Sequence, residues 1–351
     1  MDLNKYRHTP LDRSLYLMSK VMQADLPEEL ENKALEMIKT AKDSLKYGNN
    51  MFLTELTEKY INWIVQLPWF SEDKTDLDIK KAEQILEKNH YGLKDLKRQI
   101  LEFISIQIIR KEKNLGPYTG PTLFLVGLAG TGKTTFAKSI AEALGRKFLR
   151  IPFGGLSSVL ELRGEAKIKP EAEPGKIIKL LAQAKTKNPV ILLDELDRVT
   201  DSVRDAVMGV LLELLDPEQN SNFRDNYIDY PFDLSNVLFI ATANNTNNIS
   251  TAVLDRMEVV RMPSYTDEEK TVIAKIYIFP KVLKEVGLTS EDIKIDDNLW
   301  PKLVRPLGFD PGIRSLARNI RSIVRSAALK IVKGEYKSIL ITEKNYKEYI
   351  K

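Results

Sequence analysis

The sequence has 351 residues, of which 43% are hydrophobic, and its 53 basic and 49 acidic residues give a formal net charge of +4. This length and composition predict a globular protein of about two or three domains with a sizeable core. The absence of cysteine excludes disulfides and thiol nucleophiles, and the two histidines, His8 and His90, do not suffice for a zinc cluster, so we expect oxygen ligands for any metal.

Membranes and nucleic acids are not expected as partners. No run of the sequence approaches the roughly 18 to 20 apolar residues that span a bilayer, and the first residues lack the apolar core of a signal peptide. Basic and acidic residues are mixed along the chain without a basic stripe, which disfavours nucleic acid as the primary partner. We therefore expect a cytoplasmic protein, or one of an organelle matrix if the source is eukaryotic, that does not act at a membrane.

The first part of the chain, residues 1–72, is predicted to be a helical segment. Residues 26–48 have helical periodicity, with Pro27 placed for a first turn and Gly48 for a C-terminal stop. A second periodic run covers residues 52–69. This pattern is typical of helices that pack against one another.

The middle of the chain predicts a parallel sheet covered by helices. Between residues 121 and 244, short apolar runs flanked by turn signals alternate with helical stretches. The remaining chain is mostly helical, with a short strand expected at residues 338–342. We place a large α/β domain at residues 73–262 and a small, mainly α-helical domain at residues 263–351.

The strongest chemical signal is the glycine-rich turn, residues 127–135, in the stretch TLFLVGLAGTGKTTFAK. A predicted strand precedes it and a predicted helix follows, which is the context of a phosphate-binding Walker A loop. Its glycines let backbone N–H groups approach phosphates, Lys133 is expected to contact the terminal phosphates, and Thr134 to supply a hydroxyl to Mg²⁺. The predicted nucleotide-binding residues are Gly127, Leu128, Ala129, Gly130, Thr131, Gly132, Lys133, Thr134 and Thr135. The turn therefore predicts binding of ATP with Mg²⁺.

A second signal is the stretch NPVILLDELDRV, in which an apolar strand ends in two adjacent acids. Asp194 is expected to hold the Mg²⁺ shell, as in a Walker B motif, and Glu195 to polarise the attacking water. The alternative, two solvent-facing acids at a strand end, is disfavoured by the glycine-rich turn. Together the two motifs predict ATP hydrolysis. Asp197 and Arg198 are expected to form a local ion pair.

A third apolar strand, in VLFIATANN, ends at Asn244. In a parallel sheet this strand is expected beside the strand of Asp194, where the Asn244 amide would orient the water or contact the γ-phosphate. Without the other motifs, a turn asparagine would be the preferred interpretation.

The order of these motifs resembles the AAA+ ATPases, and the flanking sequence resembles the ATPase module of the Lon protease family. The matching stretches are INWIVQLPW, HYGLKDLKRQILEF, GLAGTGKTT, LLDELDRV, LDRMEVV and PGIRSLARNIR, together with residues 211–244, the most specific of them. They cover nearly the whole chain from about Leu26 onward. The resemblance implies an AAA+ P-loop ATPase domain, preceded by the N-terminal helices and followed by a small helical lid.

The resemblance also implies roles for residues outside the two motifs. Arg256 resembles the arginine finger, which acts on the nucleotide of a neighbouring subunit, and Arg314 resembles the sensor arginine of the lid. His90, Tyr91, Gly92 and Leu93 resemble the loop that lines the adenine pocket. On spacing alone, both arginines are more typical of surface ion pairs.

The implied partners are further copies of the chain in a ring, expected to be a hexamer, and unfolded protein substrates. A Lon-type Ser-Lys peptidase domain in cis or in trans is a further expected partner, because this sequence contains nothing that resembles that domain. We therefore expect an ATPase without a peptidase site.

One departure from the family lies in the polar stretch RGEAKIKPEAEPG, residues 163–175. Family members usually have an aromatic and an aliphatic residue there, which project into the central channel and grip the substrate. With the family's spacing, Lys169 and Pro170 occupy those positions, and Ile168 next to them is apolar. This favours an alternative function, a nucleotide-switched assembly or adaptor ATPase that does not translocate. A DNA-associated ATPase is disfavoured by the mixed charge.

Overall fold

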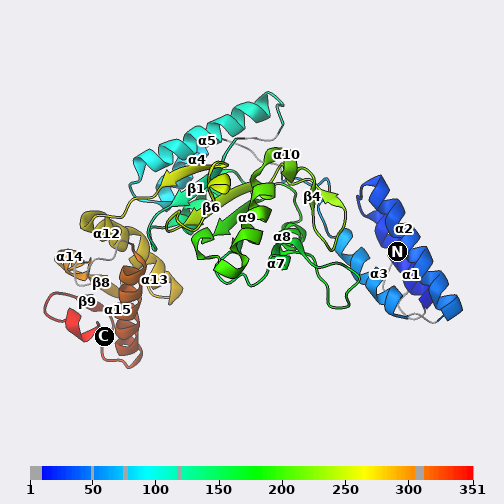
Figure 1. The fold of residues 1–351 in the computed structure, drawn as a ribbon. Helices are drawn as coiled ribbons and strands as arrows, with labels where there is room; N and C mark the ends of the chain where they lie inside the picture. Colours follow the sequence, from blue (N-terminus) through cyan, green and yellow to red (C-terminus); the bar gives the residue numbers. More distant parts are fainter. Residues whose placement is uncertain (1–9, 49–50, 74–77, 117–119, 305–311, 351) are drawn as a thin grey trace.

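A five-stranded parallel sheet lies at the centre of the computed structural model (Figure 1). The structure describes residues 10–48, 51–73, 78–116, 120–304 and 312–350. The strand order is β2-β3-β6-β1-β7, with parallel pairing throughout. The strands are β1 Thr122–Val126, β2 Phe148–Pro152, β3 Val190–Asp194, β6 Leu238–Ala243 and β7 Met257–Arg261. The predicted α/β fold with a parallel sheet is confirmed.

Helices cover both faces of this sheet. On one face Leu125 and Leu192 share a buried cluster with Phe136, and on the other Phe124 and Ile191 share a second cluster. The inner strands β1, β3 and β6 are mostly apolar because both of their faces are buried, whereas the edge strands β2 and β7 also carry exposed charged residues such as Arg150 and Glu258. The first face carries α4 Ile79–Asn89, α5 Lys94–Glu112 and α6 Lys133–Ala143, and the second carries α8 Lys176–Ala184 and α9 Asp201–Leu215.

Short elements connect these layers. They are α7 Leu160–Arg163, the 3₁₀ turn η2 Leu196–Arg198, α10 Pro217–Asn220, α11 Thr251–Leu254, and the antiparallel pair of β4 Phe223–Arg224 with β5 Pro231–Phe232.

The N-terminal helices are α1 Pro10–Gln23, α2 Glu28–Gly48 and α3 Met51–Ile64. They pack together, and they contact the segment that contains β4 and β5: the Tyr60 hydroxyl of α3 donates to the Ile228 carbonyl at 2.9 Å, and the ring of Trp69, just after α3, lies 4.9 Å from the Phe232 ring. Helix α2 starts directly after Pro27 and ends at Gly48, as predicted.

The C-terminal part has a buried cluster of its own, around Phe279, Trp300 and Ile320. It consists of α12 Asp267–Ile273, η3 Ala274–Ile278, α13 Phe279–Glu285, β8 Ile293–Ile295, η4 Asp297–Leu299, α14 Trp300–Val304, α15 Arg314–Val332, β9 Ile339–Ile341 and η6 Tyr346–Glu348. The predicted strand is β9, and its parallel partner β8 was not anticipated.

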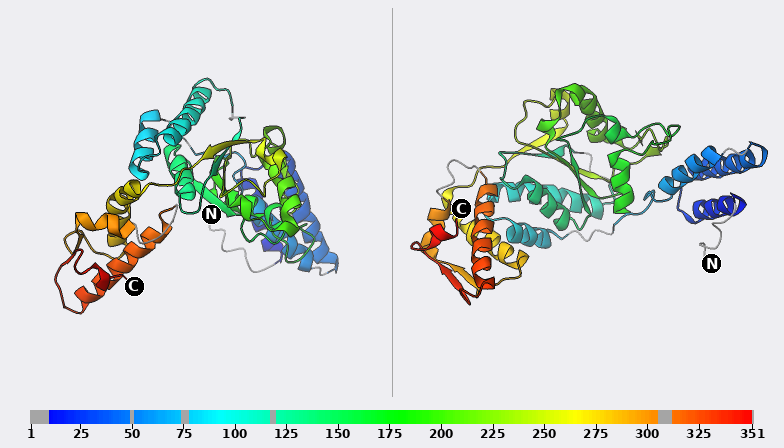
Figure 2. Two further views of the ribbon diagram at one scale, coloured as in Figure 1. Left: turned by 60° about the vertical axis from the view of Figure 1, so that its left-hand side comes forward. Right: turned by 90° about the horizontal axis from the view of Figure 1, so that it is seen from below.

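The N-terminal and C-terminal helices lie at opposite ends of the α/β part (Figure 2). Among the described helices, none has both the length and the apolar character that a bilayer crossing requires.

Candidate nucleotide site

The glycine-rich turn joins the end of β1 to the start of α6, as the sequence predicts. Gly130 and Gly132 have φ angles of 86° and 96°, in the left-handed region that favours glycine. A Cβ atom on Gly127 would lie 2.6 Å from the Met262 carbonyl oxygen, so a side chain has no room there. Because α6 begins at Lys133, the first N–H groups of this helix are available to an anion beside the turn.

Lys133 is buried at the turn, and its ammonium has three partners. It donates to the carbonyls of Gly127 and Leu128, at 2.5 and 3.0 Å, and to Oδ1 of Asn244, at 3.1 Å. Burial lowers the pKa of Lys133 below the usual lysine value, the carboxylate of Asp197 opposes this shift, and Arg314 adds to it. The sequence motif and the Asn244 strand thus meet at one ammonium group.

Asp194 lies at the end of β3 and is almost fully buried. Its Oδ1 accepts a hydrogen bond from the Thr242 hydroxyl, and its Oδ2 accepts one from Arg150 Nε at 2.6 Å. The Thr134 hydroxyl lies 3.4 Å from the same Oδ2. A threonine hydroxyl beside a carboxylate oxygen is a pair of hard donors that fits Mg²⁺.

Asn244 follows β6, which pairs with β3, so the predicted neighbourhood of these two strands is confirmed. Its amide nitrogen donates to Asp197 Oδ2 at 3.1 Å. Glu195 has a φ of 61°, and its backbone N–H donates to the Thr242 hydroxyl at 3.0 Å. Thr242 therefore ties Asp194 and Glu195 to the strand that carries Asn244.

The predicted ion pair between Asp197 and Arg198 is wrong. Arg198 instead lies 3.4 Å from the Glu195 carboxylate. The reason is the 3₁₀ turn η2 directly after the left-handed Glu195, which brings position 198 back beside position 195 and turns Asp197 toward Asn244.

Residues of the C-terminal part and of the segment just before it contact the backbone of the glycine-rich turn. The Ile313 N–H donates to the Gly130 carbonyl at 3.1 Å, and a Cβ atom on Gly130 would lie 3.4 Å from Cγ of Arg314. The Tyr265 hydroxyl donates to the Thr131 carbonyl at 3.2 Å. Arg314, predicted from the resemblance, therefore lies at the turn, whereas Tyr265 was not anticipated.

His90 packs against α6, the helix that follows the glycine-rich turn. Its Nε2 lies 3.0 Å from the Ser139 hydroxyl, and its ring is 4.6 Å from the Phe136 ring. Burial, and secondly the ammonium of Lys97, lower the pKa of His90 to about 4. The imidazole is therefore neutral at neutral pH.

The residues after His90 turn sharply toward the C-terminal part. Gly92 and Leu93 have φ angles of 63° and 53°, and a Cβ atom on Gly92 would lie 3.2 Å from Glu269 Oε1, near the start of α12. The Tyr91 side chain is partly exposed. The segment predicted to line the adenine pocket thus lies between α6 and α12, and its contact with adenine stays a prediction.

Comparison with known proteins agrees with this geometry. Residues 123–265 match the model of the ATPase family associated with various cellular activities (AAA), and residues 284–339 match the Lon protease AAA+ ATPase lid domain. The chain therefore carries an AAA domain followed by a Lon-type lid domain.

Curated relatives named Lon protease match almost the whole chain. Those of Desulforamulus reducens, Bacillus subtilis (Lon protease 1) and Fusobacterium nucleatum are 42%, 40% and 38% identical over 330, 334 and 339 residues. The matches cover 94%, 95% and 97% of this chain and 40%, 42% and 43% of those relatives. This Lon-type module therefore spans less than half the length of the curated relatives it matches.

The hydrogen bonds of Arg256 in the Lon-type module join it to residues outside the glycine-rich turn. Its guanidinium donates to Asp216 Oδ2 at 3.1 Å and to the Ala252 carbonyl at 3.0 Å. This pairing holds the pKa of Asp216 below its usual value. The ion pair expected from spacing alone is present, and a role toward a neighbouring subunit stays a prediction.

The anchored loop, residues 163–175, is closed at its base by a second pair of glycines. A Cβ atom on Gly175 would lie 2.0 Å from the Leu162 carbonyl oxygen, and Gly164 has a φ of 74°. Gly175 N–H donates at 2.7 Å to Asp225, which is buried and also accepts from two other backbone N–H groups. Burial raises the pKa of Asp225 although these bonds favour its charged form. The two ends of the loop are therefore held together.

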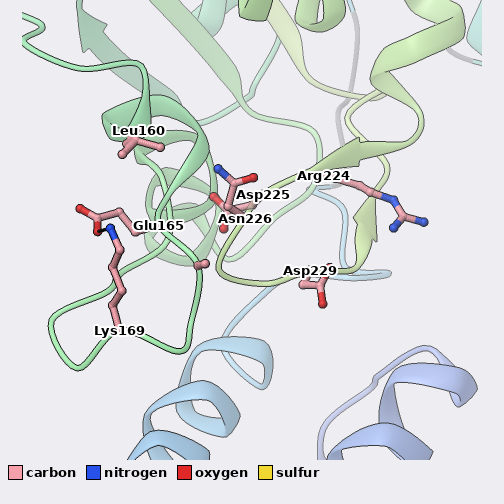
Figure 3. A pocket seen from close by; sticks show the side chains of 8 residues that line it. Leu160, Glu165, Lys169, Arg224, Asp225, Asn226 and Asp229 are labelled. Atoms are coloured by element: carbon pink, nitrogen blue, oxygen red, sulfur yellow. Dashed lines mark hydrogen bonds and ion pairs between the residues drawn. The ribbon is translucent and has the colours of Figure 1, made fainter.

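The tip of the anchored loop is polar and partly tied down. Lys169 lies 3.0 Å from Glu165, Ile168 is 78% exposed, and the Pro170 carbonyl accepts a bond from Lys59 of α3 at 3.3 Å. A pocket of about 430 Å³ lies between the anchored loop and residues 224–229 (Figure 3), lined by Leu160, Glu165, Ala166, Lys169, Arg224, Asp225, Asn226 and Asp229. The channel position of Lys169 and Pro170 stays a prediction.

Proposed function

We propose that this Lon-type module hydrolyses ATP with Mg²⁺ as part of a homo-oligomeric ring, expected to be a hexamer, and uses the energy to unfold and move protein substrates. The convergence of Lys133, Thr134, Asp194 and Asn244 at one edge of the sheet, with Arg314 of the lid facing them, carries this proposal. Membership of the AAA ATPases supports it.

In the proposed reaction the chain mainly positions groups and supplies charge. Lys133 would leave the turn carbonyls for the terminal phosphates, and Asn244 would orient the attacking water. Glu195 would accept a proton from that water. Mg²⁺, held on the Thr134 and Asp194 side, would neutralise charge on the phosphates.

Arg256 is proposed to act on the nucleotide of a neighbouring subunit. Its present partner, Asp216, is close to the surface, and the Arg256 side chain is 33% exposed. Such a pair costs little to exchange for a phosphate. Hydrolysis would then require contact between subunits, and a head-to-tail contact of this kind closes into a ring.

A second candidate function is a nucleotide-switched assembly or adaptor ATPase that does not translocate. The tip of the anchored loop favours it, because Lys169 pairs with Glu165 and the Pro170 backbone is held by Lys59. Neither residue offers the large apolar surface with which an aromatic side chain grips a passing chain.

The relatives are named Lon protease, so a Ser-Lys peptidase that receives the unfolded chain, in cis or in trans, is part of the proposal. The decisive test is ATP turnover of the purified chain with and without an unfolded protein such as casein. We expect turnover in both cases for either candidate. A casein-dependent increase that follows substitutions in the anchored loop supports the motor, and an unchanged rate supports the switch. No ATP turnover by the assembled ring would contradict both.

A further inference from the structure

The two carboxylate oxygens of Asp194 have different neighbours. Oδ1 faces β6 and accepts the hydroxyl hydrogen of Thr242. Oδ2 faces α6, because the Thr134 hydroxyl lies 3.4 Å from it. Since Thr134 is the proposed Mg²⁺ ligand, Oδ2 is the oxygen on the metal side of the site.

A cation of the chain already contacts this metal-side oxygen. Arg150 Nε donates to Oδ2 at 2.6 Å, a short, charge-assisted bond. Oδ1 is occupied by the Thr242 hydroxyl. The Arg150 guanidinium and the metal shell would therefore compete for Oδ2.

Strand register explains why Arg150 reaches Asp194. Arg150 of β2 lies opposite Leu192 of β3, and residues two apart on a strand share a face. Arg150 and Asp194 are therefore on the same face, with the long arginine side chain running up the edge of the sheet toward the strand end.

The two partners differ in their freedom to move. The Asp194 side chain is 3% exposed and is also held by Thr242, whereas the Arg150 side chain is 47% exposed. The guanidinium can therefore move into solvent without breaking buried packing, and the carboxylate cannot follow it.

We propose that Arg150 is a displaceable counter-ion of Asp194, which compensates the buried carboxylate before metal binding and competes with Mg²⁺ for Oδ2. This inference rests on the proposed binding of ATP with Mg²⁺. Exchange of one cation for another keeps the carboxylate compensated in both states. Arg150 thereby raises the Mg²⁺ concentration that the site needs.

The test is a metal titration of the full chain, with Mn²⁺ as the probe. Free Mn²⁺ is followed by electron paramagnetic resonance in the presence of saturating ADP, so the measurement does not depend on hydrolysis. For Arg150→Gln we expect a half-saturating Mn²⁺ concentration about twofold to fivefold below that of the wild type, as for loss of a half-exposed ion pair. Binding of a fluorescent ADP in EDTA should change less than about twofold.

A matched control is Arg321→Gln in the lid. Arg321 also donates through Nε to a carboxylate, that of Glu285 at 3.3 Å, and its side chain is 48% exposed. The substitution Arg321→Gln removes the same charge at a position far from Asp194, so we expect an unchanged Mn²⁺ titration.

A second measurement uses the wild type, so it does not depend on the folding of a variant. Labelling of Arg150 by phenylglyoxal, quantified by mass spectrometry, should rise when Mg²⁺ is added to the ADP-bound chain, with Arg321 labelling unchanged. Equal or weaker Mn²⁺ binding by a folded Arg150→Gln chain, or labelling of Arg150 that does not respond to Mg²⁺, overturns the counter-ion role. Failure of the wild type to bind Mn²⁺ with ADP overturns the proposed function instead.

Discussion

The glycine-rich turn and the anchored loop use the same backbone device for different ends. Each is bounded by glycines whose Cβ atoms would collide with neighbouring backbone, Gly127 in the first and Gly175 in the second. Around the turn, side chains from separate strands and from the lid converge on Lys133 and Asp194. At the tip of the anchored loop, Lys169 instead pairs with Glu165 of the same loop. Closure by glycine thus marks a fixed backbone, whereas convergence of polar groups from distant elements marks a site for chemistry.

The largest expected effect is a loss of ATP hydrolysis at the glycine-rich turn without a loss of nucleotide binding. Glu195→Gln should lower ATP turnover by about 10³-fold, because the amide no longer accepts the proton of the attacking water. Affinity for ATP should stay within about threefold of the wild type, while Lys133→Ala, which removes the phosphate-binding ammonium, should weaken it by about tenfold or more. Turnover and equilibrium binding of a fluorescent nucleotide measure both. Normal turnover by Glu195→Gln would remove the proposed base.

A second prediction tests whether the site is completed by another subunit. Arg256→Ala should lower turnover by about 10³-fold, the effect of losing an arginine finger. Mixing Arg256→Ala with Glu195→Gln chains should restore part of the activity, since an intact acid then meets an intact finger at some interfaces. Turnover per chain should also rise with protein concentration. A mixture no more active than either variant alone would show that Arg256 acts within its own chain or not at all.

A third prediction tests the backbone of the anchored loop. Gly175→Ala should lower the free energy of unfolding by about 3 kcal/mol, because the new Cβ atom collides with the Leu162 carbonyl and the base of the loop must shift. Denaturant unfolding measures this. Gly209→Ala in α9 is the control: its Cβ atom would meet nothing within 4 Å, so it should stabilise the chain by about 0.5 to 1 kcal/mol. Equal effects of the two substitutions would contradict the close approach.

A fourth prediction contrasts the buried surroundings of the turn with the solvated loop. Because the pKa of His90 is lowered to about 4, the fold favours its neutral form. The contribution of neutral His90 to the free energy of unfolding is complete above pH about 6.5, the ordinary histidine pKa, and is lost as the pH falls toward 4. Over this range we expect His90 to account for about 2 to 3 kcal/mol of the fall in unfolding free energy.

His90→Gln should remove this contribution to the pH dependence, which chemical denaturation at several pH values measures. Lys169→Gln, which breaks the exposed pair with Glu165, should change the unfolding free energy by less than about 0.5 kcal/mol at any pH. If the free energy of unfolding of His90→Gln fell with pH as steeply as that of the wild type, the imidazole would not be held neutral by the fold.

The smallest expected effect concerns substrate coupling. Lys169→Tyr combined with Pro170→Val should raise stimulation of ATP turnover by casein about twofold, because a large ring packs on any passing side chain and proline no longer fixes the loop backbone. The steady-state ATPase rate with and without casein measures it. Strong stimulation of the unaltered chain that is insensitive to changes at Ile168, Lys169 and Pro170 would place substrate coupling elsewhere.

Local patterns predicted the parts of the molecule that depend on neighbouring residues. The parallel sheet, the turn before α6 and the pairing of the strand before Asn244 with the strand of Asp194 follow from apolar runs and turn residues, and the structure confirms them. The domain limits, after residues 72 and 262, and the roles of the site residues stay predictions. What was missed depends on register and packing between distant elements. Thr242 had a signal, because it is a polar residue inside the apolar run FIATAN, whereas Arg150 shows its role only once β2 lies beside β3.

The close approach of the lid to the glycine-rich turn limits which substitutions evolution can accept at two positions. A Cβ atom on Gly312 would lie 2.6 Å from the Ala129 carbonyl oxygen, and one on Gly130 would lie 3.2 Å from Gly312 Cα. Positions 130 and 312 are distant in the sequence, yet a side chain at either one props apart the same two surfaces. A substitution at one position cannot be repaired by a smaller residue at the other, because both are already glycine. We therefore expect the two glycines to be inherited together wherever this closure is retained.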